Sequence, residues 1–142
     1  MLRPAKVLVV EDNEGDIRLV QEALKQAKSS CQLTVVKDGV AAIEHLRQQR
    51  GVSEHPDLIL LDLNLPLKDG REVLREIKED EELKHIPVLV LTSSGSADDV
   101  MTAYRLHANC YLTKPSRVND FFALLASIEE FWTRRAHLPV VA

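Results

Sequence analysis

Residues 55–70 have the sequence HPDLILLDLNLPLKDG, and this stretch decides the fold. Four consecutive apolar residues, Leu58–Leu61, are typical of a strand that is buried on both faces of a parallel sheet. The run ends at Asp62, and Pro66 and Gly70 mark the loop that follows. A carboxylate at the C-terminal end of a buried strand lies where open α/β sheets place their reactive groups. Taken alone, Asp62 is equally consistent with a cap or turn residue, so the other strand ends must decide.

Length and composition predict one globular domain. The chain has 142 residues, of which 45% are hydrophobic and 28% charged, and we expect a core over residues 6–132 with a short tail at 133–142. A net charge of −4 without a long basic run argues against nucleic acid as a direct partner. No apolar stretch approaches the ~20 residues needed to cross a bilayer, and residues 1–6 lack the apolar core of a signal peptide. We therefore expect a cytoplasmic protein without membrane contact.

The cysteines and histidines give no sign of a metal site. Cys31 and Cys110 form no CxxC motif, and the five histidines are scattered without ligand spacing. We expect both thiols to be reduced and packed in the fold.

Apolar runs alternate with helical periodicity along the whole chain. The runs predict strands over residues 6–10, 31–36, 57–61, 88–91 and 110–112. Apolar residues at spacings of three and four predict helices over residues 17–27, 38–51, 70–78, 96–106 and 117–132, with Asp38 and Ser96 as N-caps.

This pattern predicts a flavodoxin-like α/β fold, (βα)5 and doubly wound. Its five-stranded parallel sheet would have the order 2-1-3-4-5, with helices on both faces. Cys31 on strand two and Cys110 on strand five would then lie at opposite edges, which excludes a disulfide between them.

Polar side chains follow four of the predicted strands. Glu11 and Asp12 follow the first strand, Asp62 the third, Thr92 the fourth and Lys114 the fifth. Because the carboxyl ends of parallel strands share one edge, these groups should converge. Three carboxylates would repel one another unless a cation joined them, and Mg²⁺ prefers such oxygen ligands.

Phosphoryl transfer uses these same groups: a metal, a cation, a hydroxyl donor and a nucleophilic carboxylate. Asp62 is the better nucleophile candidate, because it lies on the central strand between the acidic pair and Lys114. Each residue has a simpler explanation by itself, since an acidic pair often caps a helix and Lys-Pro often forms a turn. The joint arrangement favours a site.

Four motifs in order carry a resemblance to a known family. VEDN at 10–13, LLDLNLP at 60–66, LTS at 91–93 and YLTKP at 111–115 resemble the motifs of the response-regulator receiver domain. The longer match of LNLPLKDGRE at 63–72 and the phenylalanine-rich last helix are similar to single-domain regulators that partner cyanobacterial phytochromes.

The resemblance implies a phosphoacceptor protein of two-component signalling. Asp62 would accept a phosphoryl group from a histidine of a sensor kinase, here of phytochrome type. Glu11, Asp12, Asp62 and the backbone carbonyl of Asn64 would hold Mg²⁺. Family members commonly have Asp-Asp where this chain has Glu11-Asp12, and the longer arm of Glu11 is compatible with binding through water.

The resemblance also implies a switch. Thr92 and Lys114 would contact the phosphoryl oxygens, and the Lys114–Pro115 peptide bond would be cis. Thr92 would move toward the phosphoryl group and Tyr111 would turn into the vacated space. The surface of helix four, strand five and helix five would change as a result.

The last predicted helix has more apolar residues than one packed face requires. Phe122, Leu124 and Phe131 are candidates for an exposed patch, and we expect a homodimer through this helix, extended by residues 138–142. The alternative is a monomer in which the fourth helix and the tail cover these rings.

Two other functions are compatible with the predicted fold. A phosphatase that works through an aspartyl phosphate usually needs a second Asp two residues after the nucleophile, where this chain has Asn64. A flavin-binding electron carrier would need a Ser/Thr/Gly-rich phosphate loop after the first strand, where residues 11–13 would repel a phosphate. We therefore expect a signalling protein and not a turnover enzyme.

Overall fold

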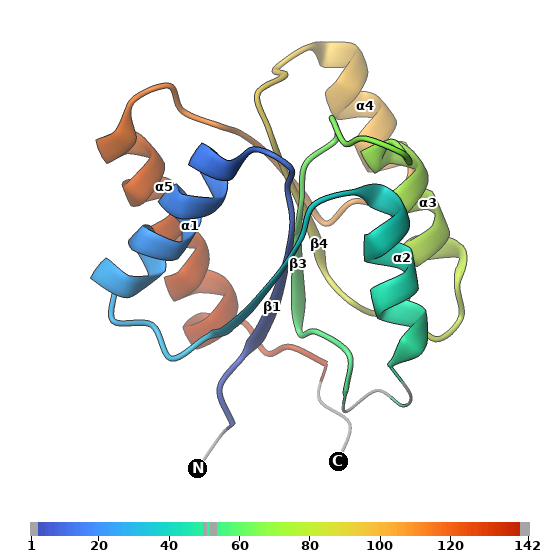
Figure 1. Ribbon diagram of the computed structural model, residues 1–142, viewed down its shortest axis with the longest axis horizontal. Helices are drawn as coiled ribbons and strands as arrows, with labels where there is room; N and C mark the ends of the chain where they lie inside the picture. The colour runs from blue at the N-terminus through green and yellow to red at the C-terminus, as the bar shows by residue number, and fades with distance from the viewer. Residues whose placement is uncertain (1–2, 50, 52–53, 140–142) are drawn as a thin grey trace.

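The computed structural model describes residues 3–49, 51 and 54–139. The strands are β1 (Lys6–Val10), β2 (Gln32–Val36), β3 (Leu58–Leu61), β4 (Val88–Thr92) and β5 (Cys110–Thr113). The helices are α1 (Glu14–Gln26), α2 (Gly39–Gln48), α3 (Gly70–Glu79), α4 (Ala97–Arg105) and α5 (Val118–Glu130), and α5 continues into the π-helical turn η2 (Phe131–Arg135). Strands and helices alternate as predicted (Figure 1).

Several helix ends differ from the prediction by up to three residues, as at the start of α1, which lies at Glu14 and not at residue 17. α2 ends at Gln48, short of the predicted stop at Gly51. Gly51 lies beyond the helix with a φ of 84°, a conformation that favours glycine. Arg50 lies outside the described residues.

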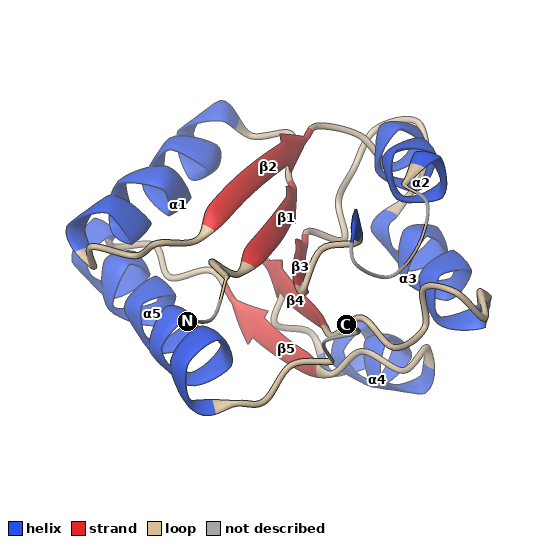
Figure 2. Cartoon of the chain, turned by 90° about the horizontal axis from the view of Figure 1, so that it is seen from below, coloured by secondary structure: helices blue, strands red, loops and turns tan. Residues whose placement is uncertain are grey.

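The sheet confirms the predicted fold. All four strand pairs are parallel and the order is β2-β1-β3-β4-β5. α1 and α5 cover one face, and α2, α3 and α4 cover the other (Figure 2). Cys31 and Cys110 are free thiols at the two edges of the sheet, as predicted.

The unbroken apolar run of β3 follows from this double covering. Leu58 and Leu60 pack toward α1 and α5, while Ile59 and Leu61 pack toward α2 and α3. All four are at most 3% exposed, and burying one such side chain stabilises the fold by about 1.5–3 kcal/mol. The buried sheet therefore gives the residues at its edge a rigid backbone.

Polar side chains start the helices directly after the strands. Asp38 Oδ1 accepts a hydrogen bond from Ala41 N at 2.7 Å, and Ser96 Oγ accepts one from Asp99 N at 3.1 Å, so both predicted caps are confirmed. Asn13 Oδ1 caps α1 in the same way, accepting from Asp16 N at 2.9 Å. These caps fix the first turn of each helix close to the strand ends.

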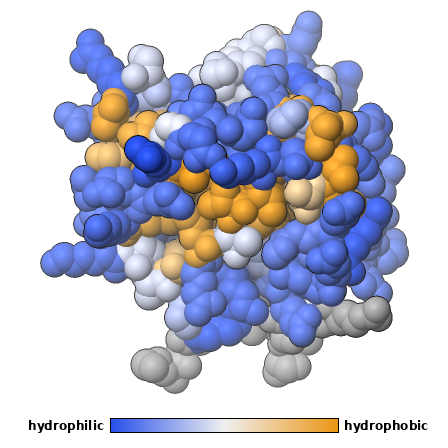
Figure 3. Space-filling view, in the orientation of Figure 1, coloured by the Kyte–Doolittle hydropathy of each residue, from blue (hydrophilic) through white to orange (hydrophobic). Residues whose placement is uncertain are grey.

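Figure 3 shows apolar residues across the middle of one face, with polar residues above and below them. On the last helix, Phe122 and Leu124 are half-buried and pack against the core on the α1 side. Phe131 is 56% exposed, with its ring edge-on to Trp132. Of the predicted tail contact, residues 140–142 lie outside the described part of the chain. No helix among the described residues has the length and apolar character needed to cross a membrane.

Candidate functional site

The polar residues at the upper sheet edge of Figure 1 are held by the sheet itself. The backbone N–H of Glu11 donates to Val36 O at 3.0 Å, and that of Asp62 donates to Val10 O at 3.0 Å. The backbone N–H of Lys114 donates to Thr92 O at 2.7 Å. Each side chain therefore starts from backbone that is still part of the strand ladder, which limits its movement.

Three carboxylates meet at this edge. Glu11, Asp12 and Asp62 each have an oxygen within 4.8 Å of the others. Glu11 and Asp62 are buried, whereas Asp12 is exposed. The structure thus brings together the acidic residues that the sequence analysis assigned to a metal. Three hard oxygen donors around one point fit a divalent cation such as Mg²⁺.

Lys114 lies at the centre of these acids. Its ammonium donates to Glu11 Oε2 at 2.5 Å, to Asp62 Oδ2 at 2.7 Å and to Asp16 Oδ2 at 2.8 Å. Asp16 was not anticipated as a site residue. It belongs to the first turn of α1, and the turn from β1 into α1 brings that turn to the same sheet edge as the strand ends.

Burial and charge change the acidity of these groups. Burial raises the pKa of Glu11, and the nearby Asp62 charge adds to this against the hydrogen bond from Lys114, so that the pKa is about 7. Burial acts in the same direction on Asp62, but hydrogen bonds from Lys114 and from Asn64 N outweigh it and hold the pKa of Asp62 below its usual value. Burial alone would lower the pKa of Lys114, yet the three carboxylates outweigh it and raise that pKa. Asp62 and Lys114 therefore remain charged near neutral pH.

Thr92 ends β4 beside this cluster, as predicted. Its side chain is 0% exposed, and its Oγ1 has no hydrogen-bond partner within the described residues. A buried hydroxyl without a partner destabilises a fold by about 1–3 kcal/mol. Such a group is explained if an acceptor, for example an oxyanion, arrives at the site during function.

Close packing fixes the loop from β3 to α3. Asn64 N donates to Asp62 Oδ1 at 3.0 Å, which holds the carboxylate in one orientation. A Cβ on Gly70 would lie 2.3 Å from Asp62 O, and a Cβ on Gly39 would lie 2.0 Å from Lys68 O. Only glycine fits at these two places, so the loop carrying the candidate nucleophile is clamped between α2 and α3.

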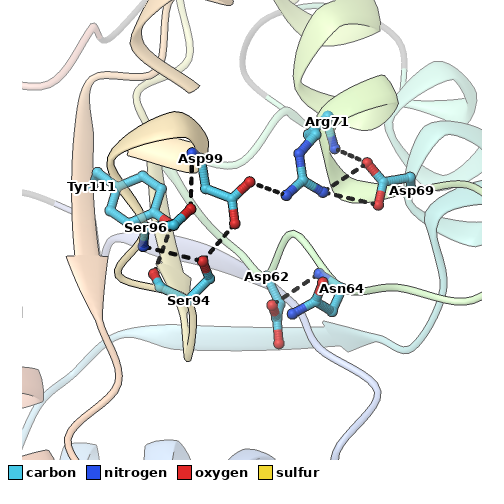
Figure 4. Close-up of polar contacts among 8 residues, drawn as sticks. All are labelled: Asp62, Asn64, Asp69, Arg71, Ser94, Ser96, Asp99 and Tyr111. Atoms are coloured by element: carbon cyan, nitrogen blue, oxygen red, sulfur yellow. Dashed lines mark hydrogen bonds and ion pairs between the residues drawn. The ribbon is translucent and has the colours of Figure 1, made fainter. Parts of the chain in front are cut away.

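A second polar network extends from the site toward α4 (Figure 4). Tyr111 OH donates to Ser94 O at 2.7 Å, and Ser94 Oγ donates to Asp99 Oδ2 at 2.5 Å. Arg71 Nη2 donates to Asp99 Oδ1 at 2.7 Å, and Arg71 Nη1 donates to Asp69 Oδ1 at 3.2 Å. The hydrogen bond from Ser94, followed by that from Arg71, lowers the pKa of Asp99. Tyr111 is thus tied through the β4–α4 loop to the first turns of α3 and α4.

The prediction of a cis peptide bond between Lys114 and Pro115 is wrong. Every described peptide bond is trans. The trans form is the lower in energy even before proline, by about 0.5–1 kcal/mol.

The class of the protein follows from this site and its fold. The profile of the response regulator receiver domain matches residues 7–126. The chain belongs to that family, and it is a response regulator of two-component signal transduction.

Particular relatives are similar over nearly the whole chain. Response regulator Rcp1 of Synechocystis sp. is 51% identical over 138 residues, which cover 96% of this chain and 94% of Rcp1. The crystal structure of its Mn²⁺-bound form has a TM-score of 0.88 and covers 96% of this chain and 100% of that chain. The phosphorylated cyanobacterial phytochrome response regulator RcpA is 49% identical with a TM-score of 0.91, covering 97% of this chain and 100% of its own.

A third relative has a structure that contains a bound metal ion. The receiver domain of the Pseudomonas aeruginosa sensor histidine kinase PA1611 was solved with a magnesium ion in its active-site cleft. It is 27% identical with a TM-score of 0.71, over 92% of this chain and 98% of that one.

Proposed function

We propose that Asp62 is the phosphoacceptor of this response regulator and takes its phosphoryl group from a sensor histidine kinase. The observation that carries the proposal is the position of Asp62, which is buried and ionised with Lys114 Nζ at 2.7 Å. In the transfer, an Asp62 oxygen forms a bond to phosphorus while the P–N bond of the kinase phosphohistidine breaks. The electron pair of that bond stays on the imidazole, which takes up a proton.

We propose that Glu11, Asp12, Asp62 and the backbone carbonyl of Asn64 hold Mg²⁺. The carboxylate oxygens within 4.8 Å of one another support this assignment. When bound, the ion would neutralise charge on the phosphoryl group and on these acids. Holding three acids in one place is the part that the protein contributes.

Lys114 and Thr92 complete the proposed site. Lys114 Nζ would follow the growing negative charge onto the phosphoryl oxygens, since its ammonium already bonds the accepting carboxylate. The unpartnered Thr92 Oγ1 would donate to a phosphoryl oxygen and thereby gain the hydrogen bond it lacks.

We propose that the signal leaves through α4, β5 and α5. When Thr92 moves toward the phosphoryl group, the Tyr111 hydroxyl would leave Ser94 O, and its ring, which already packs partly against the core, would turn further inward. Pro115, next to Lys114, would limit how β5 continues into α5. Met101 and Tyr104 on α4 are about half exposed, so a shift of this helix would change the outer surface.

A phytochrome-type sensor histidine kinase is the partner that we propose. The likeness to a cyanobacterial phytochrome response regulator over 97% of this chain supports this choice. We expect the protein to act in the cytoplasm, where a kinase finds ATP. The residue two positions after Asp62 is Asn64, whose amide cannot act as a general acid or base. This supports a signalling role without turnover of a substrate.

We also propose a homodimer through α5 and its continuation η2, with Phe122, Leu124 and Phe131 at the contact. The exposed Phe131 ring supports it most directly, because the other two side chains already pack partly against the core. Sedimentation velocity of the wild type and of Phe131→Ser tests it. A wild type that stays monomeric at high concentration, with and without a phosphoryl donor, would overturn the dimer.

The phosphoacceptor is tested by incubation with Mg²⁺ and acetyl phosphate, followed by intact mass. We expect one labile phosphoryl adduct on the wild type and none on Asp62→Asn. Asp57→Asn, which removes a buried carboxylate at the other end of β3, is the matched control and should keep the adduct. An adduct that persists in Asp62→Asn would contradict the assignment.

A further inference from the structure

Asp16 forms a contact that neither phosphoryl acceptance nor the proposed metal site explains. Its Oδ2 lies 2.8 Å from Lys114 Nζ, although the two residues are 98 positions apart in the chain. The Asp16 side chain is 27% exposed and that of Lys114 only 10%. The acid thus closes the solvent side of a nearly buried cation.

The contact completes the coordination of the ammonium. A lysine ammonium has three N–H donors, and Lys114 directs one to each of Glu11, Asp16 and Asp62. Lys114 and the three acids line a cavity of about 10 Å³, whose other lining residues are apolar and include Val20 and Phe121. Within the described residues, the hydrogen bonds of the ammonium go to these three acids, so we expect its position to depend on them.

A metal ion and a phosphoryl group would engage some of these three acids but not all of them. Glu11 and Asp62 belong to the carboxylate cluster that can hold a metal, whereas Asp16 does not. A bound divalent cation would engage Glu11 and Asp62, and its like charge would repel Lys114. Phosphorylation would then modify Asp62 itself. Asp16 is the one partner of Lys114 that stays available throughout.

A simpler role for Asp16 must be separated from this one. An acid in the first turn of a helix stabilises the helix dipole wherever its side chain points. Glu14 lies in the same first turn of α1 and pairs with Lys37 at the surface, without contact to Lys114. The chain therefore contains its own control for charge near the helix end.

We propose that Asp16 is a positioning residue, which holds the Lys114 ammonium at the phosphoryl site while Glu11 and Asp62 are engaged by the metal and the phosphoryl group. The inference rests on the proposed function of Asp62. It assigns to the start of α1 a part in phosphoryl transfer that acts through Lys114.

The test measures initial rates of phosphorylation of the full chain by intact mass, at saturating Mg²⁺ and over a range of acetyl phosphate concentrations. For Asp16→Asn we expect the maximal rate to fall about tenfold, with the half-saturating donor concentration within about twofold of wild type. Asp16→Glu restores the carboxylate and should recover at least about half of the loss on a logarithmic scale. Glu14→Gln, which removes the same charge from the same turn, should stay within about twofold of wild type.

Three results would overturn the inference. The first is an Asp16→Asn protein with the wild-type maximal rate, whether or not its unfolding temperature falls. The second is an equal loss in Glu14→Gln, because it would assign the effect to charge alone, and the third is no recovery in Asp16→Glu. A wild type that accepts no phosphoryl group at all is a different failure, since it would overturn the proposed function from which the inference starts.

Discussion

β3 has a buried aspartate at each end, and their surroundings are opposite. Asp57 precedes the strand at 7% exposure and Asp62 follows it at 6%. Asp57 accepts two hydrogen bonds from the Arg3 guanidinium, at 2.7 and 2.8 Å, and a third from Lys6 N at 2.9 Å. Asp62 shares one ammonium with two other acids and faces Glu11 and Asp12.

The difference is the one that we expect between a structural carboxylate and the proposed phosphoacceptor. Asp57 has a guanidinium fork of its own and a backbone donor, and within the described residues neither group bonds another acid. Around Asp62, one ammonium serves three carboxylates, and a buried hydroxyl nearby has no acceptor among the described residues. The first arrangement stabilises the fold, and the second stores unfavourable interactions that a metal and a phosphoryl group can relieve.

Removing the cation from each aspartate should separate the two roles most strongly. Lys114→Met should lower the maximal rate of phosphorylation by acetyl phosphate by about 100-fold, because the charge that forms on the phosphoryl oxygens loses its ammonium. Arg3→Met removes the partner of Asp57 and should leave this rate within about twofold of wild type. Initial rates by intact mass give both numbers, and comparable losses in the two variants would erase the distinction.

Stability should respond in the reverse order. Asp57→Asn should lower the free energy of unfolding by about 2 kcal/mol, because Arg3 and Lys6 N lose a charged acceptor. Asp62→Asn should lower it by less than about 1 kcal/mol, because the weaker hydrogen bonds from Lys114 and Asn64 N are partly offset by the loss of the Asp62 charge that acts on Glu11. Urea unfolding followed by circular dichroism measures both. The comparison fails if Asp62→Asn proves the more damaging change.

Mg²⁺ should stabilise only through the Asp62 end. At ten times its dissociation constant, a ligand of the native state adds about 1.4 kcal/mol to the free energy of unfolding. We expect this gain in the wild type and in Asp57→Asn, and its loss in Asp12→Asn, whose exposed side chain has no other partner in the described structure. Thermal unfolding with Mg²⁺ and with EDTA measures it, and an unchanged gain in Asp12→Asn would remove Asp12 from the metal site.

We expect the smallest effect at a third acid, Asp99, which is more exposed than Asp57 and Asp62. Asp99 is bonded by Arg71 and Ser94 near the surface, so Arg71→Met should lower the free energy of unfolding only slightly. Its larger effect should be faster amide exchange in the β4–α4 loop around Ser94, because the loop loses one of its ties. Arg75→Met is the control, since Arg75 pairs with Glu72 within α3. Equal exchange in both variants would mean that the Arg71 network does not hold the loop.

Much of this molecule could be predicted from its sequence because strand burial leaves a direct trace. The apolar run before Asp62 and the polar residues after each strand were sufficient for the sheet order and for the meeting of Glu11, Asp62 and Lys114. These features depend only on which strands are covered on both faces and on the shared edge of parallel strands.

Asp16 could not be found in the same way. In the sequence it is one acid in the first turn of a helix, and acids are common there for the sake of the dipole. Only the reach of Lys114 across from β5 distinguishes it from Glu14, and this depends on side-chain geometry. The half-buried state of Phe122 and Leu124 was hidden for a similar reason, since a count of apolar residues does not tell how wide the contact between α5 and its neighbours is.

The order of the strands along the chain also determines when the proposed phosphorylation site is completed during synthesis. Glu11 and Asp62 leave the ribosome long before Lys114, and β1 can pair with β2 and β3 while β5 is still missing. Until β5 joins the edge of the sheet beside β4, the acids lack the ammonium that compensates them. Asp62 would therefore accept a phosphoryl group only after the sheet is complete, and incomplete chains would not carry the signal.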